Sequence, residues 1–316
     1  MTRLAIVVPC YNEEEVLKET SQRLLRLLNQ LEQENLVSHN SFVLFVNDGS
    51  KDLTWPIITE LRQSNNIQIW GCNLANNVGH QNALWAGLDI ASKYADAIVS
   101  IDADLQDDEM AIVEMVKNYN AGFDIVYGVR QSRGTDSFFK RNTAIWFYRL
   151  MESLGCKTVF NHADYRLMSQ RATKHLLSFP ERNLFIRGIV PTIGYRTASV
   201  YYDRRTRFAG ESKYPLSKML NFAIDGITSF SVKPVRLVFM LGLIFILVSL
   251  FVLIWILVVW SKGDVVAGWS SLMVSVWFVG GAVLMGIGVV GEYVGKIYLE
   301  TKQRPRYNVQ EVLSND

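Results

Sequence analysis

The stretch that decides the fold is AIVSIDADLQ, residues 97–106, in which an apolar run is followed at once by closely spaced carboxylates. The run Ala97–Ile101 has the length and the apolar content of a buried strand. Asp102 and Asp104 are separated by one residue, and Gln106 follows two residues later. Ligands of open α/β sheets bind at the carboxyl ends of the strands. The sequence therefore predicts a binding site directly after this strand.

The region before residue 130 repeats the same pattern of an apolar run followed by an amphipathic stretch. Such alternation is typical of a largely parallel sheet that helices cover on both faces. We predict further strands at Leu4–Val8, Phe42–Val46, Ile67–Trp70 and Asp124–Tyr127. We predict helices near residues 13–34, 53–64, 79–92 and 109–120. The predicted fold class is α/β with a mostly parallel sheet.

Two other predicted strands also end in polar residues. Pro9, Tyr11 and Glu13 follow the first strand, and Asp48 follows the second. A tyrosine ring can flank a nucleoside base and a carboxylate can hydrogen-bond it. Asp48 equally suits a turn or a helix cap, and Glu13 equally suits the first turn of a helix. These residues are predicted to lie at the same edge of the sheet as Asp102.

Phosphate-binding glycine loops are not found where a nucleotide enzyme would need them. No GxGxxG follows the first strand, and the chain contains no GxxxxGK[ST]. The oxygen atoms of Asp102, Asp104 and Gln106 suit Mg²⁺ or Mn²⁺, and such an ion can bridge a diphosphate. An Asp-x-Asp pair is also common in solvated turns, but its place at a strand end favours a nucleotide-sugar site. His80, at the start of a predicted helix, is interpreted as a cap or packing residue.

Two uncharged runs near the C-terminus, Leu237–Trp260 and Val265–Gly291, each exceed the ~20 residues that cross a bilayer. Only residues 261–264 separate them, which predicts a tight antiparallel hairpin. Basic residues flank the outer ends of the hairpin, at Lys233, Arg236, Lys296, Lys302, Arg304 and Arg306. The turn contains one lysine, so the positive-inside rule places both ends in the cytosol. Two buried core helices are the alternative interpretation.

Composition is consistent with one α/β domain and a membrane segment. The chain has 316 residues, of which 49% are hydrophobic, and a net charge of +2 that gives no reason to expect a nucleic-acid partner. Its 3 cysteines form no CxxC pair, so no disulfide framework or zinc site is predicted. We predict a cytosolic domain at 1–213 with an interfacial helix at about 137–154, an amphipathic helix at 214–233, a hairpin at 234–294 and a cytosolic tail at 295–316.

The series PCYNEEE, VNDGSKD, NVGHQNALWAGL, DADLQD and HADYRLMS resembles the family-2 glycosyltransferases of the GT-A fold. RFAGESKY, ITSFSVKPVRL, the hairpin and GEYVGKIYLETKQRPRY more closely resemble the polyprenyl-phosphate members, which include dolichyl-phosphate mannose synthase and bacterial bactoprenol glucosyltransferases. The likeness covers nearly the whole chain. The QxxRW signature of processive synthases is absent from the sequence, which favours the transfer of a single sugar.

The resemblance also implies roles for individual residues. The implied nucleotide-binding residues are Pro9, Tyr11, Glu13, Asp48, Asp102, Arg207 and Lys213. The implied metal ligands are Asp102, Asp104 and Gln106, and the implied acceptor-phosphate ligands are Arg130, Lys140, Arg141 and Ser212. Asp104 and Asp164 are the implied catalytic residues. Asp164 either orients the phosphate or accepts a late proton, and its alternatives are an ion pair with Arg166 or a turn cap. The cations alternatively form a basic surface for anionic lipids.

These expectations amount to an inverting, metal-dependent glycosyltransferase in a bacterial inner membrane. It would move one sugar, with glucose from UDP-glucose preferred, to undecaprenyl phosphate or another polyprenyl phosphate. The lipid phosphate has a second pKa of about 6 and is largely ionised at neutral pH, so a strong general base is not required. Alternatives are a GDP-mannose enzyme of the dolichyl-phosphate type, transfer of GlcNAc, galactose or aminoarabinose, and a sugar-nucleotide sensor without turnover. The resemblance also implies a homo-oligomer, a tetramer, which a row of glycines in the second apolar run supports.

Overall fold

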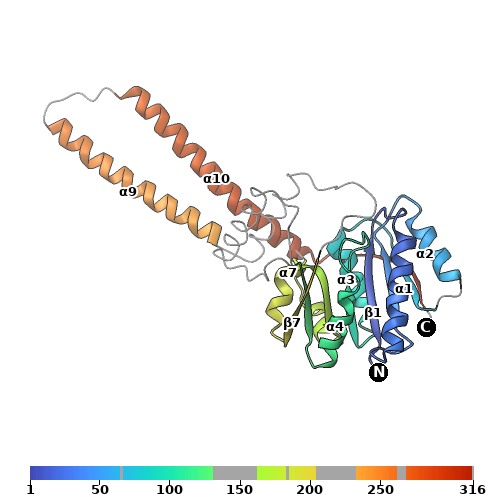
Figure 1. Cartoon of the computed structure of the whole chain (residues 1–316). Helices are drawn as coiled ribbons and strands as arrows, with labels where there is room; N and C mark the ends of the chain where they lie inside the picture. Colours follow the sequence, from blue (N-terminus) through green and yellow to red (C-terminus); the bar gives the residue numbers. More distant parts are fainter. Residues whose placement is uncertain (65–66, 131–161, 183–184, 204–232, 262–267, 315–316) are drawn as a thin grey trace.

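The protein is represented by a computed structural model of the whole chain (Figure 1). It describes residues 1–64, 67–130, 162–182, 185–203, 233–261 and 268–314. The predicted amphipathic helices at about 137–154 and at 214–233 lie outside the described residues, apart from Lys233. The structure divides into an α/β domain and a long pair of helices that extends away from it.

One sheet of eight strands forms the centre of the α/β domain, in the order β7-β5-β6-β4-β1-β2-β3-β8. The strands are β1 (Leu4–Cys10), β2 (Phe42–Asn47), β3 (Ile69–Leu74), β4 (Ala97–Ser100), β5 (Ile125–Arg130), β6 (His162–Ser169), β7 (Thr197–Tyr202) and β8 (Val309–Leu313). β1 pairs in parallel with β2 and β4, β2 with β3, and β5 with β7. The prediction of a mostly parallel α/β sheet is confirmed.

Helices cover both faces of this sheet. They are α1 (Leu17–Gln33), α2 (Thr54–Gln63), α3 (His80–Ala91), α4 (Ala111–Asn120), α6 (Gln170–Leu177), α7 (Ile186–Ile189) and the 3-10 helix η1 (Val190–Ile193). α1, α2 and α4 pack on the face that contains Leu4 and Ile6, whereas α3, α6 and α7 pack on the face that contains Ala5 and Val7. Because both faces are covered, every residue of β1 is buried, which explains its unbroken apolar run.

Helix α3 lies unusually close to the sheet because of Gly87. A Cβ atom at this position would come within 2.8 Å of a methyl group of Val46 and would also collide with Val7. Helix α3 begins at His80, at the carboxyl ends of the central strands. The close packing of Gly87 therefore fixes the position of the residues that begin α3.

Two features of the sheet were not predicted. β6 lies between β4 and β5 and is antiparallel to both. β8 adds an antiparallel strand to the edge of β3, so part of the predicted 295–316 tail is built into the α/β domain. A free strand edge exposes unpaired amide and carbonyl groups, and β8 supplies partners for those of β3.

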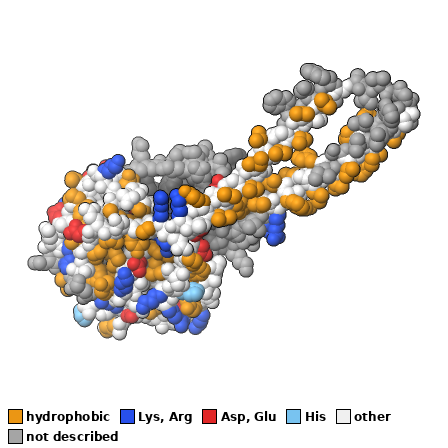
Figure 2. Space-filling model, turned by 180° about the vertical axis from the view of Figure 1, so that it is seen from behind, with side chains coloured by type: hydrophobic (Ala, Val, Ile, Leu, Met, Phe, Trp, Pro, Cys, Tyr) orange, Lys and Arg blue, Asp and Glu red, His pale blue; other side chains and the backbone are white. Residues whose placement is uncertain are grey.

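The paired helices are α9 (Lys233–Ser261) and α10 (Trp269–Lys302). Each contains a stretch that is long and apolar enough to cross a membrane, Val235–Val252 in α9 and Phe278–Lys302 in α10. Figure 2 shows apolar side chains along the described outer surfaces of both helices. The buried shares of these stretches are 0% and 6%, which disfavours the alternative of two core helices.

Candidate active site

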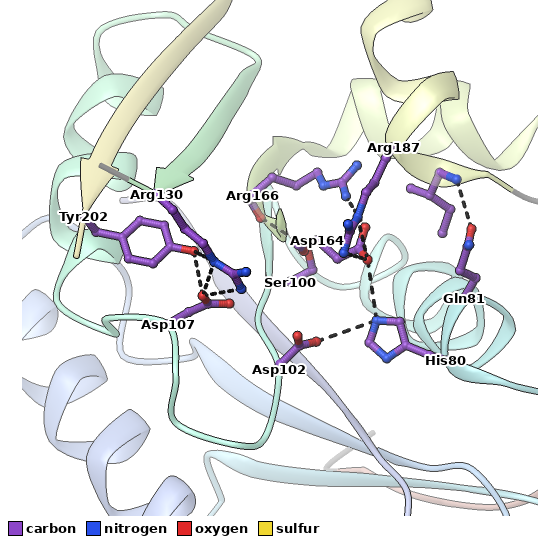
Figure 3. Close-up of polar contacts among 11 residues, drawn as sticks. His80, Gln81, Ser100, Asp102, Asp107, Arg130, Asp164, Arg166, Arg187 and Tyr202 are labelled. Atoms are coloured by element: carbon purple, nitrogen blue, oxygen red, sulfur yellow. Dashed lines mark hydrogen bonds and ion pairs between the residues drawn. The ribbon is translucent and has the colours of Figure 1, made fainter. Parts of the chain in front are cut away.

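Several polar side chains converge where the central strands end (Figure 3). Asp102 follows β4, Asp164 lies within β6, and His80 begins α3. His80 Nε2 lies 3.6 Å from Asp102 Oδ1 and 3.8 Å from Asp164 Oδ2. The predicted cap or packing role does not describe His80, because its imidazole lies between two carboxylates.

The loop Asp102–Gln106, here called the acidic loop, is held in a strained conformation. Leu105 has a φ of 57°, a left-handed value that is costly for a residue with a Cβ atom, yet its side chain is buried. The backbone amide of Gln106 donates to Asp104 Oδ1 over 3.1 Å. Thr20 of α1 donates its hydroxyl to the carbonyl of Ala103 over 2.8 Å. Local strain that the surrounding structure holds in place is typical of functional loops.

Carboxylates crowd around Asp102. Burial raises the pKa of Asp102, and the charges of Asp107, Asp164 and Asp104 raise it further, whereas His80 opposes the shift. A bound cation would relieve this repulsion. Asp102 therefore lies in an environment that favours a positive ligand.

The acidic loop offers the ligand types that Mg²⁺ or Mn²⁺ prefers. Asp102, Asp104 and Gln106 supply hard oxygen atoms. Within the described ranges, no three His, Cys, Asp or Glu side chains form a ready metal site. Mg²⁺ commonly takes only one or two carboxylates from the protein and completes its shell with water and substrate phosphates. The donor set of this loop therefore fits such an ion.

Asp164 is neutralised by two arginines. Arg166 Nη2 donates to Asp164 Oδ1 over 2.6 Å, and Arg187 donates to Oδ2 from Nη2 over 2.9 Å and from Nε over 3.1 Å. Burial alone would raise the pKa of Asp164, but Arg187, Arg166 and His80 together hold it well below its usual value. The structure thus contains the Arg166 ion pair that the sequence left open as an alternative. A carboxylate held so firmly in its ionised form is a poor proton acceptor.

Arg130 forms a second ion pair on the other side of the acidic loop. Arg130 Nη2 lies 2.9 Å from Asp107 Oδ1, and the hydroxyl of Tyr202 donates to the same oxygen over 2.6 Å. The charge of Asp107 raises the pKa of Arg130 although burial opposes this shift. Arg130 remains at the margin of the site, and its predicted contact with the acceptor phosphate stays a prediction.

The predicted nucleotide-binding residues of the first two strands differ in exposure. Pro9 is buried within β1, whereas Tyr11 is 39% exposed in the loop that follows. Asp48 is buried and accepts the backbone amides of Val78 and Gly79 over 2.7 and 3.0 Å. Asp48 therefore fixes the loop that leads into α3, a different loop from its own turn, and its predicted contact with the base stays a prediction.

The backbone amide of Glu13 donates to the hydroxyl of Thr54 over 2.9 Å, so the loop after β1 is tied to the start of α2. Lys140, Arg141, Arg207, Ser212 and Lys213 lie outside the described residues. Their predicted contacts with the substrates stay predictions.

Comparison with known proteins identifies the family. Residues 5–177 match the profile of glycosyl transferase family 2. The chain belongs to this family. The glycosyltransferase is 52% identical over 313 residues, 99% of this chain and 93% of the relative, to an uncharacterized glycosyltransferase, YkoT, of Bacillus subtilis (strain 168). It is 40% identical over 310 residues, 98% of this chain and 99% of the relative, to a bactoprenol glucosyl transferase of Shigella phage SfX.

Solved structures include more distant neighbours of this glycosyltransferase. One is a glucosyl-3-phosphoglycerate synthase from Mycobacterium tuberculosis, crystallised with Mn²⁺, UDP and phosphoglyceric acid. It shares 18% sequence identity, with a TM-score of 0.46, over 72% of this chain and 76% of that chain.

Two residues of the site were missed by sequence reasoning. Arg187 lies on α7, 23 residues after Asp164, and no spacing rule connects them. Gln81 accepts the backbone amide of Ile186 over 3.0 Å and so links α3 to the start of α7. The motif NVGHQNALWAGL contains both His80 and Gln81, and its likeness to the family was the available signal for this part of the site.

Proposed function

We propose that this glycosyltransferase moves a single glucose from UDP-glucose to the phosphate of undecaprenyl phosphate, with inversion at the anomeric carbon. The observation that carries the proposal is the identity of 40% over nearly the whole length with relatives named bactoprenol glucosyl transferase. Two apolar helices, the second of which leads into strand β8 of the sheet, support a substrate that resides in a membrane.

The reaction would replace the bond between the anomeric carbon and the nucleoside diphosphate with a bond to an oxygen of the lipid phosphate. The lipid phosphate is largely ionised at neutral pH and can attack without losing a proton to a strong base. The pairing of Asp164 with Arg166 and Arg187 supports a mechanism of this kind. The protein would then contribute mainly orientation and charge stabilisation.

Asp102, Asp104 and Gln106 would hold Mg²⁺ or Mn²⁺. When bound, the cation would neutralise the charge that develops on the departing diphosphate. The raised pKa of Asp102 among neighbouring carboxylates supports a cation at this loop. Tyr11, Glu13 and Asp48 would line the nucleoside part of the site, with Arg207 and Lys213 beside the diphosphate. Arg130, Lys140, Arg141 and Ser212 would contribute to the acceptor side.

We place the protein in a bacterial inner membrane, with the catalytic domain and both ends of the chain in the cytosol. The basic residues at the outer ends of the helix pair support this orientation. Close packing through Gly280, Gly281 and Gly288 of α10 would suit a homo-oligomer, for which we propose a tetramer. A Cβ atom added at any of these three glycines would meet no described atom within 4 Å.

The donor can be tested with purified full-length protein in detergent micelles. The protein is incubated with undecaprenyl phosphate, Mg²⁺ and a panel of UDP- and GDP-sugars, and lipids are analysed by mass spectrometry. We expect a hexosyl lipid from UDP-glucose. A product from GDP-mannose alone would favour the dolichyl-phosphate-mannose type of enzyme, and a product from another UDP-sugar would correct the sugar. No glycolipid from any donor would contradict the proposal.

A further inference from the structure

Arg187 lies in the first turn of α7, beside the acidic loop but outside it (Figure 3). Its side chain is 35% exposed, whereas that of its partner Asp164 is 10% exposed and that of Arg166 is 1% exposed. Arg187 is therefore the member of this cluster that solvent or a substrate can reach most easily.

The surrounding structure holds Arg187 in a fixed orientation. Two of its nitrogen atoms donate to the same Asp164 oxygen, and Ser100 donates its hydroxyl to the backbone carbonyl of Asp164 over 2.6 Å. The amide of the preceding residue, Ile186, is bound by Gln81 of α3. A guanidinium that is fixed in this way loses little conformational entropy when it binds a ligand.

The Asp164 cluster, defined as Asp164, Arg166 and Arg187, contains two guanidinium groups and one carboxylate. Two nitrogens of the buried Arg166 have no hydrogen-bond partner among the described residues. The cluster therefore carries one positive charge in excess, next to a loop that is rich in carboxylates. An anion that binds here would form charge-assisted hydrogen bonds with the guanidinium groups.

The cluster also lies next to the place where the reaction would occur. His80 contacts both Asp164 and Asp102, so Arg187 is connected to the acidic loop through three successive side-chain contacts. A phosphate bound to Arg187 would thus lie near a donor diphosphate at the acidic loop. Two anions that approach each other need separate positive partners.

Helix α7, which contains Arg187, lies on the side of the domain where α10 joins it (Figure 1). The amide of Arg182, just before α7, donates to both carboxylate oxygens of Glu300 in α10 over 2.8 Å each. Arg306, just after α10, donates to the carbonyl of Phe179 over 2.8 Å. Helix α7 therefore lies close to the domain end of an apolar helix, and the phosphate of a membrane lipid is an anion that such a helix would bring near.

We propose that Arg187 binds the phosphate of the lipid acceptor and that Asp164 is a positioning residue that holds Arg187 in place. The assignment rests on the proposed function. It replaces the role of Asp164 as a proton acceptor with an electrostatic one. It also adds an acceptor ligand on α7 to those predicted from the sequence.

The test measures binding of undecaprenyl phosphate to full-length protein in detergent micelles, without donor, for Arg187→Gln, Arg187→Lys and the wild type. Undecaprenol, which has no phosphate, and UDP with Mg²⁺ are the comparison ligands. We expect Arg187→Gln to weaken binding of undecaprenyl phosphate, and to raise its KM, at least about tenfold, the usual scale of a charged hydrogen bond. Binding of undecaprenol and of UDP should stay within about twofold of wild type.

Arg171→Gln is the matched control, because Arg171, whose side chain is 67% exposed, forms a similar pair of bonds to the buried Asp124, over 2.6 and 2.7 Å. This variant should bind undecaprenyl phosphate and UDP as the wild type does. Arg187→Lys keeps the charge but not the paired donors, so its affinity for undecaprenyl phosphate should lie between those of the wild type and Arg187→Gln. It serves as the test if Arg187→Gln does not fold.

Asp164→Asn should raise the KM for undecaprenyl phosphate and leave the shape of the pH–rate profile unchanged. If Asp164 were a proton acceptor, Asp164→Asn would instead remove the acidic limb of that profile. Wild-type binding of undecaprenyl phosphate by Arg187→Gln would overturn the inference, as would a loss confined to UDP. If the wild type itself neither binds undecaprenyl phosphate nor glycosylates it, the proposed function fails first and the inference fails with it.

Discussion

The acidic loop and the Asp164 cluster lie side by side and contain the same chemical group in opposite environments. Burial and three other carboxylates raise the pKa of Asp102, whereas two arginines lower that of Asp164. One carboxylate is neutralised by the fold, and the other is surrounded by like charge. We infer that Asp164 belongs to a fixed anion-binding cluster and that Asp102 belongs to a loop that binds a cation.

The largest expected effect comes from removing a ligand of the acidic loop. Asp104→Ala should lower the rate of sugar transfer by about 1,000-fold or more, because loss of metal-assisted charge stabilisation costs several kcal/mol. The unfolding temperature without metal should match that of the wild type, because the Asp104 side chain is not part of the core. The rate is measured with saturating substrates and Mg²⁺. Near-normal turnover would contradict the assignment of the loop as a metal site.

Substitution within the Asp164 cluster should lower the stability of the folded protein. Arg166→Met removes one partner of a buried ion pair, and such a loss costs about 3 kcal/mol, or about 6 to 12 °C in unfolding temperature for a domain of this size. Arg166 is 1% exposed, so water cannot replace the missing charge. Thermal unfolding of the full chain in detergent micelles measures the change. A variant as stable as the wild type would mean that Arg187 alone neutralises Asp164.

A divalent metal ion should stabilise the protein through the acidic loop and not through the Asp164 cluster. At a Mg²⁺ concentration about 100 times its Kd, binding to the folded state adds about 2.7 kcal/mol. We expect a higher unfolding temperature for the wild type and for Arg166→Met, and no change for Asp104→Ala. The measurement is a melting series with Mg²⁺ or EDTA. An equal shift in Asp104→Ala would place the cation elsewhere.

The central strands could be predicted because their signal is local. The strands near Leu4, Phe42 and Ala97 are fully buried, and the strand near Ile125 is buried except at Arg130, so their mostly apolar composition identifies them. The predicted strand at Ile67–Trp70 begins two residues early and ends four short, because the chain continues through less apolar residues to Leu74. The two long apolar helices were equally predictable from their uncharged runs.

The features that were not predicted depend on partners that are distant along the chain. Asp164 and Arg166 make β6 resemble a polar loop, although both side chains are buried through their mutual ion pair and through Arg187. Likewise, β8 is short and mostly exposed, and its pairing with β3 depends on a free sheet edge that no local pattern reveals. The acidic loop was therefore found from sequence, whereas the Asp164–Arg166 pair was only one of the alternatives and Arg187 was missed.

The response to pH should distinguish the two carboxylates further. The pKa of Asp164 is lower in the folded state, so its stabilising contribution is complete above its unfolded pKa of about 4 and is lost as the pH falls below that value. The difference in unfolding temperature between the wild type and Asp164→Asn should be constant from about pH 8 to about pH 5.5 and should narrow below about pH 4. A difference that narrows near neutral pH would contradict the ion-paired state.

The smallest effect is expected at the pair of Arg171 and Asp124. The guanidinium of Arg171 lowers the pKa of Asp124, whose side chain is 6% exposed, but the Arg171 side chain is 67% exposed. Ser169 also donates its hydroxyl to Asp124, over 2.9 Å. Water can reach the arginine of this pair, and ion pairs at the surface contribute little. Arg171→Gln should therefore lower the unfolding temperature less than Arg166→Met does, and an equal loss of stability would show that exposure of the arginine is not what separates this pair from the Asp164 cluster.

The most direct test of the account is the mass of the lipid formed from undecaprenyl phosphate and UDP-glucose by the full-length protein with Mg²⁺. The account predicts a lipid that carries one hexose on its phosphate, absent with EDTA and with Asp104→Ala. A lipid that carries several sugars, or one that forms equally well with EDTA, would contradict it.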